Sequence, residues 1–342
     1  MVADVSTSDR GIRIACVTSR EALDRLRPEW DALWARVPDR TPFQSTAWLL
    51  PWWDIFGRGD LRALEIRNDR RLVGLVPLYL SDESGGELRL LGAGNSDYLD
   101  ALAAPGHESD VAHALERYLE CSRQEWRFCT FDHVRPGSVL LRANAPDGLH
   151  DLRADDTPCP TLDVPRSVDF VPDAIGASLA ADIRYCRRRA ERLGGLSVVK
   201  ATPENVDELL TALFELHRIR WARKGGNGVL GDDAVRAFHR TVAPALLEAG
   251  LLRLFALRVG GRTAAVQYGM QTTDRAFFYI SGFDPRFASL SAGKLALAAA
   301  LEQAVTEGVF TFDFLGGREA YKYEWGATDR PRLNRQLRRV PS

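Results

Sequence analysis

The segment from residue 310 to residue 326, FTFDFLGGREAYKYEWG, combines side chains that could carry out acid–base chemistry. Asp313 is the one acid in a short apolar run of the kind that forms a buried strand, and the run stops at Gly316 and Gly317. Lys322 follows among aromatic residues. This order predicts a cleft at a strand end, where the acid and the lysine could meet a substrate. A buried strand with one structurally paired aspartate is the alternative, and the residues alone leave both open.

This segment resembles the end of the Fem aminoacyl transferases and of the cellulose-biosynthesis-type acetyltransferases, two branches of the GNAT superfamily. In both, an Asp-Phe strand, glycines, and a lysine shortly before an aromatic residue and a glycine recur together. The resemblance implies an acyltransferase in which Lys322 stabilises developing charge. Asp313 is then the first candidate for the base or for the group that orients the acceptor, with Glu319 and Tyr279 as further candidates. The matching positions are Asp313, Phe314, Gly316, Gly317, Lys322, Trp325 and Gly326, and Trp325 is expected at the substrate.

Length and composition set the broad class of the protein. At 342 residues the chain is long enough for two domains. Its 45% hydrophobic and 27% charged residues are typical of a soluble globular protein, and a net charge of −1 gives no overall attraction to nucleic acids or membranes. The five cysteines form no CxxC pair, and neither they nor the histidines show metal-ligand spacing. We therefore expect reduced thiols, no metal and, without a signal-peptide pattern, a cytoplasmic protein lacking a membrane span.

A weak internal repeat organises the chain. Residues 61–80 and 252–271 both show a strand, a turn and a strand, with Asn68-Asp69 in one turn and Gly260-Gly261 in the other. Each hairpin is followed by a third strand, a helix and a further strand, and each is preceded by helices. The following elements are expected at 87–91, 109–123 and 128–131 in the first half, and at 276–281, 292–307 and 310–315 in the second. The preceding helices are expected at 20–36, 46–56, 173–193, 204–222 and 232–249.

This order of elements is that of a GNAT fold. We therefore expect an α+β protein with two tandem GNAT-like modules, each a mixed, mostly antiparallel sheet flanked by helices. Prolines and a short polar run between 158 and 165 interrupt the patterns, so we expect modules at 1–160 and 161–342. The resemblance implies that the second module carries the acyltransferase site and that the first is non-catalytic, on the acceptor side.

The turn before the helix expected at 292–307, FDPRFASLSAGK, corresponds to the GNAT turn that holds the pyrophosphate of acyl-CoA. Unpaired N–H groups and the helix dipole favour an anion at such a helix start. Counting from Arg286, Ser289 and Ser291 stand where the family signature has glycines. Gly293 permits close approach, and Lys294 could neutralise charge. The resemblance thus implies acyl-CoA, such as acetyl-CoA, as co-substrate; an ordinary serine-capped helix is the alternative.

An arginine-rich stretch, DIRYCRRRAERL, is expected on a helix. Arg184, Arg188 and Arg192 share one face. They are candidate contacts for CoA phosphates, a nucleotide-linked acceptor or the tRNA backbone. A solvated helix face is the alternative.

A polar loop follows the strand that ends near Gly92. Asn95, Asp97 and Tyr98 lie in this loop, and loops at strand ends often hold substrates. In the family this loop faces the acceptor, which makes these residues candidate acceptor contacts. A plain turn is the alternative.

The leading hypothesis is a GNAT-type N-acyltransferase that moves an acyl group directly from acyl-CoA to an amine. In this superfamily a backbone N–H, expected here on 262–272, stabilises the oxyanion. The acceptor would be a small molecule or a cell-envelope precursor. One alternative is a Fem-like transferase that uses aminoacyl-tRNA; the other is a non-catalytic binding protein on a GNAT frame.

Overall fold

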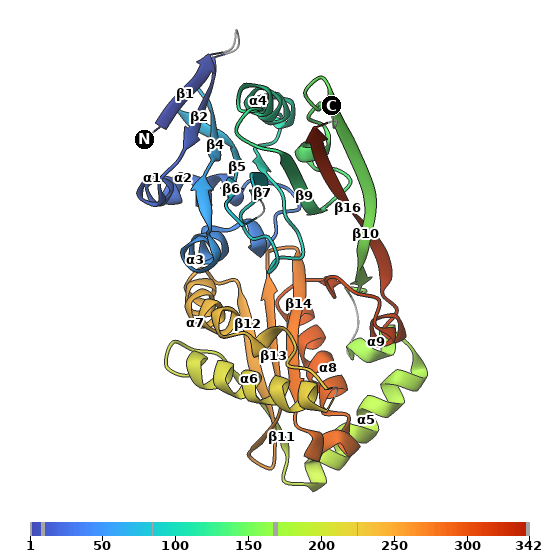
Figure 1. Ribbon diagram of the computed structural model, residues 1–342. Helices are drawn as coiled ribbons and strands as arrows, with labels where there is room; N and C mark the ends of the chain where they lie inside the picture. Colours follow the sequence, from blue (N-terminus) through green and yellow to red (C-terminus); the bar gives the residue numbers. More distant parts are fainter. Residues whose placement is uncertain (1, 8–10, 84, 167–169, 224, 340–342) are drawn as a thin grey trace. The chain divides into compact units, whose positions relative to one another are not determined.

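The computed structural model describes residues 2–7, 11–83, 85–166, 170–223 and 225–339 (Figure 1). The chain forms two compact units, here called unit 1 and unit 2: residues 1–157 together with 331–342, and residues 158–330. The division falls close to the expected boundary, but the last twelve residues belong to unit 1 rather than to the second module. They do so because β16 (Thr328–Arg339) pairs antiparallel with β9 (Phe128–Val134) of unit 1.

Unit 1 contains a five-stranded group in the order β1-β2-β4-β5-β8 and a second group in which β16, β9, β7, β6 and β3 are neighbours. Pro77 separates β5 from β6, so the chain leaves one group and enters the other at a residue that cannot donate to a ladder. The strands of unit 1 are β1 Val2–Thr7, β2 Ile12–Val17, β3 Gly59–Leu61, β4 Ala63–Asn68, β5 Arg71–Val76, β6 Leu78–Ser81, β7 Glu87–Leu90, β8 Leu102–Ala103 and β9; its helices are α1 Arg20–Arg25, α2 Arg27–Trp34, α3 Thr46–Phe56 and α4 Glu108–Cys121, with 3-10 turns η1 Pro42–Gln44 and η2 Val139–Leu141.

Unit 2 has one sheet in the order β11-β12-β13-β14-β15-β10, mostly antiparallel, with β10 entering from unit 1 and ending beside β15. Its strands are β10 Leu149–Asp163, β11 Leu196–Lys200, β12 Leu252–Val259, β13 Arg262–Gln271, β14 Arg275–Phe283 and β15 Thr311–Asp313. Its helices are α5 Ala177–Arg192, α6 Val206–Ala222, α7 Asp233–Glu248, α8 Ala292–Thr306 and α9 Ala320–Glu324, with 3-10 turns η3 Val171–Ala174, η4 Val229–Gly231 and η5 Pro285–Leu290.

Helices cover both faces of the sheet of unit 2. α6 lies across β12, β13 and β14 (Figure 1), and a Cβ on Gly282 would meet Leu216 of α6 at 2.8 Å. The next residue, Phe283, points the other way, because its ring lies beside Gly293 of α8. The apolar run of α8 completes a core with β12, β13, β14 and the buried face of α5.

The internal repeat is visible in the topology of both units. In unit 1, β7 and β9 are parallel neighbours, and the chain between them forms α4. In unit 2, β14 and β15 are parallel neighbours, and the chain between them forms α8. Both units also place a hairpin, β4–β5 or β12–β13, before this crossover. The predicted α+β fold with two tandem modules is confirmed.

Other general features concern only the residues with a described structure. Among these, no helix is both long and apolar enough to cross a membrane. No group of three or more His, Cys, Asp or Glu side chains in the same residues could hold a metal ion.

Candidate active site

The strands β14 and β15 pair over a short length and then part. Their parallel register joins Arg275 with Thr311, Ala276 with Phe312, and Phe277 with Asp313. β14 continues to Phe283, but β15 ends at Asp313. Beyond Phe277, therefore, no strand among the described residues pairs with this edge of β14. An unpaired strand edge offers backbone N–H and C=O groups to a ligand.

A β-bulge lies just beyond the point where the strands part. In the β13–β14 ladder, Tyr268 faces Ile280 and Gly269 faces Phe278. Tyr279 is therefore the extra residue on β14. Bulges interrupt the ladder and redirect a side chain, and they are frequent next to active sites. The sequence pattern had pointed to β13 for a backbone oxyanion donor, whereas the extra residue lies on β14.

The turn that ends β15 has a strained backbone that Asp313 helps to fix. Leu315 has a φ of 58°, in the left-handed region that a branched residue rarely adopts. Asp313 is 0% exposed; one of its carboxylate oxygens accepts a 2.8 Å hydrogen bond from the N–H of Leu315, and the other lies 3.6 Å from Arg275. The strand therefore ends at Asp313, two residues earlier than the predicted 315.

Lys322 holds the same turn from the other side. Its Nζ donates to the carbonyl oxygens of Leu315, Gly316 and Gly317 at 3.0, 2.9 and 3.2 Å. It also lies 2.9 Å from a carboxylate oxygen of Glu319, and the residue is 2% exposed. The structure thus brings the predicted Asp313 and Lys322 together, as two groups that fix the conformation of one turn.

Glu319 is the acid of this group that reaches solvent, with 58% of its side chain exposed. Burial alone would raise the pKa of its carboxyl group, but the Lys322 hydrogen bond, its own backbone and Arg220 outweigh this effect and lower the pKa. Tyr321 stands nearby, and burial together with Glu319 raises its pKa to about 12. Glu319 is therefore an ionised acceptor beside a neutral phenol.

Arg220, which the sequence pattern did not single out, brings a positive charge from α6. Its guanidinium lies 5.7 Å from the centre of the Phe283 ring at the end of β14. It also acts electrostatically on Glu319 and Tyr321. Arg220 therefore lies close to Phe283 at the end of β14 and acts on Glu319, which follows β15.

Tyr279 belongs to an aromatic cluster that also escaped sequence analysis. Its ring is 5.5 Å from that of His239 and 5.6 Å from that of Tyr268, both in edge-to-face geometry. Burial lowers the pKa of His239 to about 3 and raises that of Tyr268. The uncharged rings of His239 and Tyr268 thus pack against Tyr279, the extra residue of the bulge.

Trp325, predicted at the substrate, is 2% exposed and lies in the apolar core of unit 2.

The turn predicted to bind pyrophosphate is a 3-10 helix, η5, that leads directly into α8. Ser291 has a φ of 49°, and its side chain does not cap α8. Among the described residues, no acceptor outside α8 is found for the backbone N–H groups of Ala292, Gly293 and Lys294. A Cβ on Gly293 would meet only the Phe283 ring, at 3.4 Å and beyond. The first turn of α8 therefore offers unpaired donors beside the end of β14.

The charged residues of this turn have partners within unit 2. Arg286 binds the carboxylate of Asp284, its neighbour at the start of η5. Lys294 lies 3.2 Å from Asp182 of α5, and Arg189 donates to the carbonyl oxygen of Ser289 at 3.2 Å. Lys294 and Arg189 therefore flank the first turn of α8, whereas Arg286 is neutralised locally.

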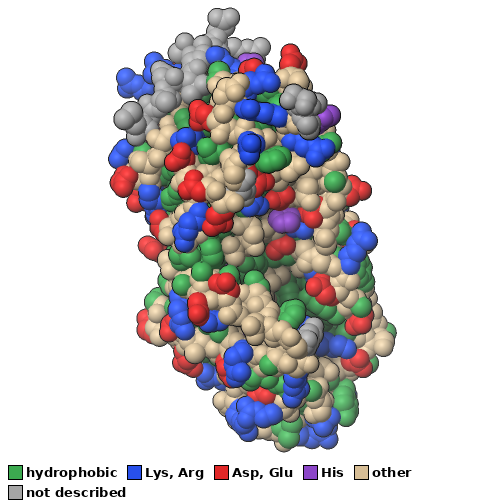
Figure 2. All heavy atoms as spheres, viewed as in Figure 1, with side chains coloured by type: hydrophobic (Ala, Val, Ile, Leu, Met, Phe, Trp, Pro, Cys, Tyr) green, Lys and Arg blue, Asp and Glu red, His purple; other side chains and the backbone are tan. Residues whose placement is uncertain are grey.

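The arginines of α5 divide into two groups. Arg184 pairs with Asp173 and lies over the Phe170 ring, and Arg187 pairs with Glu302. Arg188 and Arg192 are exposed. In Figure 2, Lys and Arg side chains gather over the lower end of unit 2, where α5 ends and β11 begins. This end of α5 offers a basic surface to solvent.

The candidate acceptor residues of unit 1 make contacts within that unit. Asn95 accepts a 3.1 Å hydrogen bond from the indole of Trp52. The backbone carbonyl of Asp97 accepts from Arg332, and Tyr98 is buried, with Arg135 over its ring at 5.7 Å. The loop is thus held in place by its own predicted residues. The structure places them in unit 1 and the residues around Asp313 in unit 2.

The sequence of unit 2 matches a known family. Residues 177–323 match the family model described as an acetyltransferase (GNAT) domain. This part of the chain is similar in sequence to GNAT acetyltransferase domains, which confirms the predicted resemblance and the predicted acyltransferase class. A comparison with curated protein sequences finds no match.

Solved structures share the fold over nearly the whole chain. FemX has a TM-score of 0.65 at 13% identity, covering 90% of this chain and 95% of its own. L-PGS from Bacillus licheniformis has a TM-score of 0.53 at 13% identity, covering 85% and 87%. A tandem GNAT protein from the clavulanic acid biosynthesis pathway has a TM-score of 0.50 at 16% identity, covering 96% and 99%. At these identities the likeness is one of fold.

Proposed function

We propose that unit 2 is an N-acyltransferase that moves an acyl group from acyl-CoA directly to an amine. The observation that carries the proposal is the opening between β14 and β15, with a bulge at Tyr279, in a GNAT domain. The acyl group would lie along the unpaired edge of β14. A backbone N–H at the bulge would then stabilise the oxyanion, because a fixed donor in a low-dielectric site needs little reorganisation.

Glu319 is the proposed proton acceptor. The acceptor amine must be neutral before it attacks the thioester carbonyl; a C–N bond then forms, the C–S bond breaks, and the thiolate leaves. Glu319 is the acid at this opening with an exposed carboxylate, whereas Asp313 is fully buried. Asp313 and Lys322 then act as positioning residues, because their polar atoms are directed at the turn that ends β15.

The first turn of α8 is compatible with the phosphates of acyl-CoA. Its N–H groups have no outside acceptor among the described residues, and Gly293 leaves room beside them. Lys294 and Arg189 stand close by, although Lys294 is shared with Asp182. Ser291 stands where the family signature has a glycine, but its side chain accepts no hydrogen bond from the N–H groups of α8, so these groups stay open to a ligand. Ala292, Gly293 and Lys294 would hold the phosphates through their backbone.

One observation favours aminoacyl-tRNA as the alternative donor. Arg188 and Arg192 are exposed on α5, and Tyr185, 51% exposed, lies on the same helix. Arginines with an exposed aromatic ring are suited to a nucleic-acid backbone and its bases. The Fem transferases, which the sequence resembles, use such donors.

The test of the proposed base is the release of CoA thiol with a panel of amines as acceptors. Glu319→Gln should lower turnover by about 10²–10⁴, while Glu248→Gln, an exposed carboxylate at the end of α7, should leave it unchanged. Turnover of Glu319→Gln within twofold of the parent protein, by contrast, would remove Glu319 from the mechanism.

The donors are separated by a second pair of measurements. If acyl-CoA is the donor, activity survives ribonuclease and is insensitive to the double variant Arg188→Glu, Arg192→Glu. If aminoacyl-tRNA is the donor, both treatments abolish transfer, and no CoA species stabilises the protein.

A further inference from the structure

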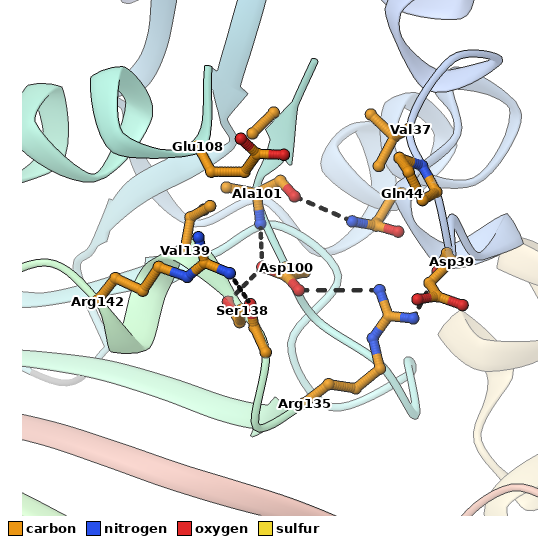
Figure 3. Close-up of a pocket in the computed structure, with 13 residues that line it drawn as sticks. Val37, Asp39, Gln44, Asp100, Ala101, Glu108, Arg135, Ser138, Val139 and Arg142 are labelled. Carbon is orange, nitrogen blue, oxygen red and sulfur yellow. Dashed lines mark hydrogen bonds and ion pairs between the residues drawn. The ribbon is translucent and has the colours of Figure 1, made fainter. Parts of the chain in front are cut away.

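Unit 1 contains a cavity of about 240 Å³ built from three separate stretches of the chain. The segment after α2 contributes Val37 to Gln44, the segment around β8 and the start of α4 contributes Asp100 to Glu108, and the segment before and within η2 contributes Arg135 to Arg142 (Figure 3). At ~30 Å³ per water molecule, this is room for about eight waters. All the lining residues belong to unit 1.

Asp100 lines the cavity and is paired there with Arg135 (Figure 3). Its side chain is 9% exposed. Its Oδ1 accepts hydrogen bonds from Ala101 N at 2.8 Å and from Ser138 Oγ at 2.5 Å. Its Oδ2 forms an ion pair with Arg135 at 3.8 Å, which is longer than a hydrogen bond, and no hydrogen-bond donor to it is found among the described residues. Oδ2 can therefore still accept a hydrogen bond from a ligand or water.

A second acid faces the same space from the start of α4. One oxygen of Glu108 accepts from Gly106 N at 3.0 Å, and no donor to the other is found in the described part of the chain. Two carboxylates with open acceptor sites are suited to an ammonium group, which has three donors. Burial raises the pKa of Asp100, although Arg135, Ser138, Ala101 and Arg142 oppose that rise.

Two arginines add positive charge on other sides of the cavity. Arg142 is exposed, and its one hydrogen bond among the described residues is a long one, 3.4 Å, to the carbonyl of Gly137. Arg135 donates to the backbone carbonyl of Asp39 and lies over Tyr98. The guanidinium group of Arg142 can therefore bind the carboxylate of a ligand through two parallel hydrogen bonds.

Between these charges the cavity is lined by small apolar side chains. Gln44 is held by Thr41 and Ala101, so it closes one wall without moving. The apolar lining is formed by Val37, Pro38, Ala101, Ala103 and Val139. A zwitterion can contact both the carboxylates of Asp100 and Glu108 and the guanidinium of Arg142, whereas a ligand with a single charge is attracted by one of these two sets.

We infer that this cavity is a binding site for a small zwitterion, an α-amino acid with a short apolar side chain. Asp100 and Glu108 receive its ammonium group, Arg142 receives its carboxylate, and the apolar wall takes its side chain. The inference does not depend on the proposed acyl transfer, because the site lies within unit 1 and its test uses no acyl donor.

The test is calorimetric titration of the whole protein with alanine and valine, and with ethylamine and propionate as analogues that carry one charge each. The amino acids should bind saturably, and each analogue should bind at least about tenfold more weakly. Glu108→Gln and Arg142→Gln should each weaken amino-acid binding by about tenfold or more. Arg70→Gln, an exposed arginine of unit 1 outside the cavity, should bind like the parent protein.

Glu108 and Arg142 are chosen because they are less buried than Asp100, whose Oδ1 contacts support the fold. Circular dichroism of each variant confirms that it has folded before it is titrated. The inference is overturned by any of three results: neither amino acid binds, the analogues bind as well as the amino acids, or both variants bind with unchanged affinity.

Discussion

Replacing Lys322 with methionine tests whether this lysine fixes the turn after β15. Methionine keeps the length and most of the apolar contacts of the side chain, but it removes the ammonium group. The carbonyl oxygens of Leu315, Gly316 and Gly317 then lose their common donor. Glu319 also loses its partner, but its exposed carboxylate can be solvated instead.

The size of the effect follows from the burial of each acceptor. The carbonyl of Leu315 accepts in a fully buried bond, so leaving it without a donor costs about 1–3 kcal/mol. The bonds to Gly316 and Gly317 are part-buried, and water can replace the donor there at a cost of about 1 kcal/mol for the two. We therefore expect Lys322→Met to lower the free energy of unfolding of unit 2 by about 2–4 kcal/mol.

Urea unfolding with hydrogen exchange of residues 311–325 measures this change in unit 2 separately from unit 1. Exchange should accelerate at Leu315 and through α9, because the turn opens more often. Glu319→Gln is the matched control, which should cost less than about 1 kcal/mol because an exposed ion pair contributes little. If Lys322→Met unfolds at the parent midpoint with an unchanged slope, the ammonium does not support the turn, and its role must be a direct one.

Three further predictions concern unit 2. Ser291→Gly should stabilise it by about 1 kcal/mol, because a serine at a φ of 49° is strained and caps nothing, and thermal unfolding checks this. His239 has a pKa near 3 in the folded protein and about 6.5 in the unfolded chain, which therefore binds the proton more readily. The free energy of unfolding should thus fall by about 2 kcal/mol from pH 7 to pH 5. Denaturant unfolding should show a shallower pH dependence in His239→Phe. Gly282→Leu should disrupt the packing of α6, because its Cβ alone would approach Leu216 to 2.8 Å, and a lower unfolding midpoint is expected.

Local patterns were sufficient to predict the order of elements. The hairpin β12–β13 turns at Gly260 and Gly261, whose positive φ values are those that glycine adopts without strain. The apolar run of α8 and the largely apolar run of β12 both mark elements that are buried in the core. These signals lie within single segments, which explains why they could be read without a structure.

The features of the site that sequence could not supply depend on contacts between distant segments. The bulge at Tyr279 is a shift in register between two strands, and neither Tyr279 nor its chain neighbours Phe278 and Ile280 is a glycine or proline that would mark it. The spacing of Asp313 and Lys322 suggested chemistry, but their orientation toward one turn became visible only in three dimensions. Trp325 was expected at the substrate, whereas its burial places it in the core of unit 2.

The cavity of unit 1 shows the same limit. Asp100 follows the polar loop of Asn95, Asp97 and Tyr98, but its partners Arg135 and Ser138 come from a segment more than thirty residues further along the chain. No local pattern joins such segments.

The most direct test of the proposed function is a thermal-shift titration of the whole protein with acetyl-CoA and free CoA, alongside Gly293→Asp. The substitution places a carboxylate at the first turn of α8, where it suits the helix dipole but repels phosphate. Gly137→Asp in unit 1, with no atom within 4 Å of the added Cβ and no positive φ, provides a control. The account predicts saturable stabilisation of about 2.7 kcal/mol at 100 times the dissociation constant, lost in Gly293→Asp and retained in Gly137→Asp. A shift that is absent for every CoA species, or unchanged in Gly293→Asp, would contradict it.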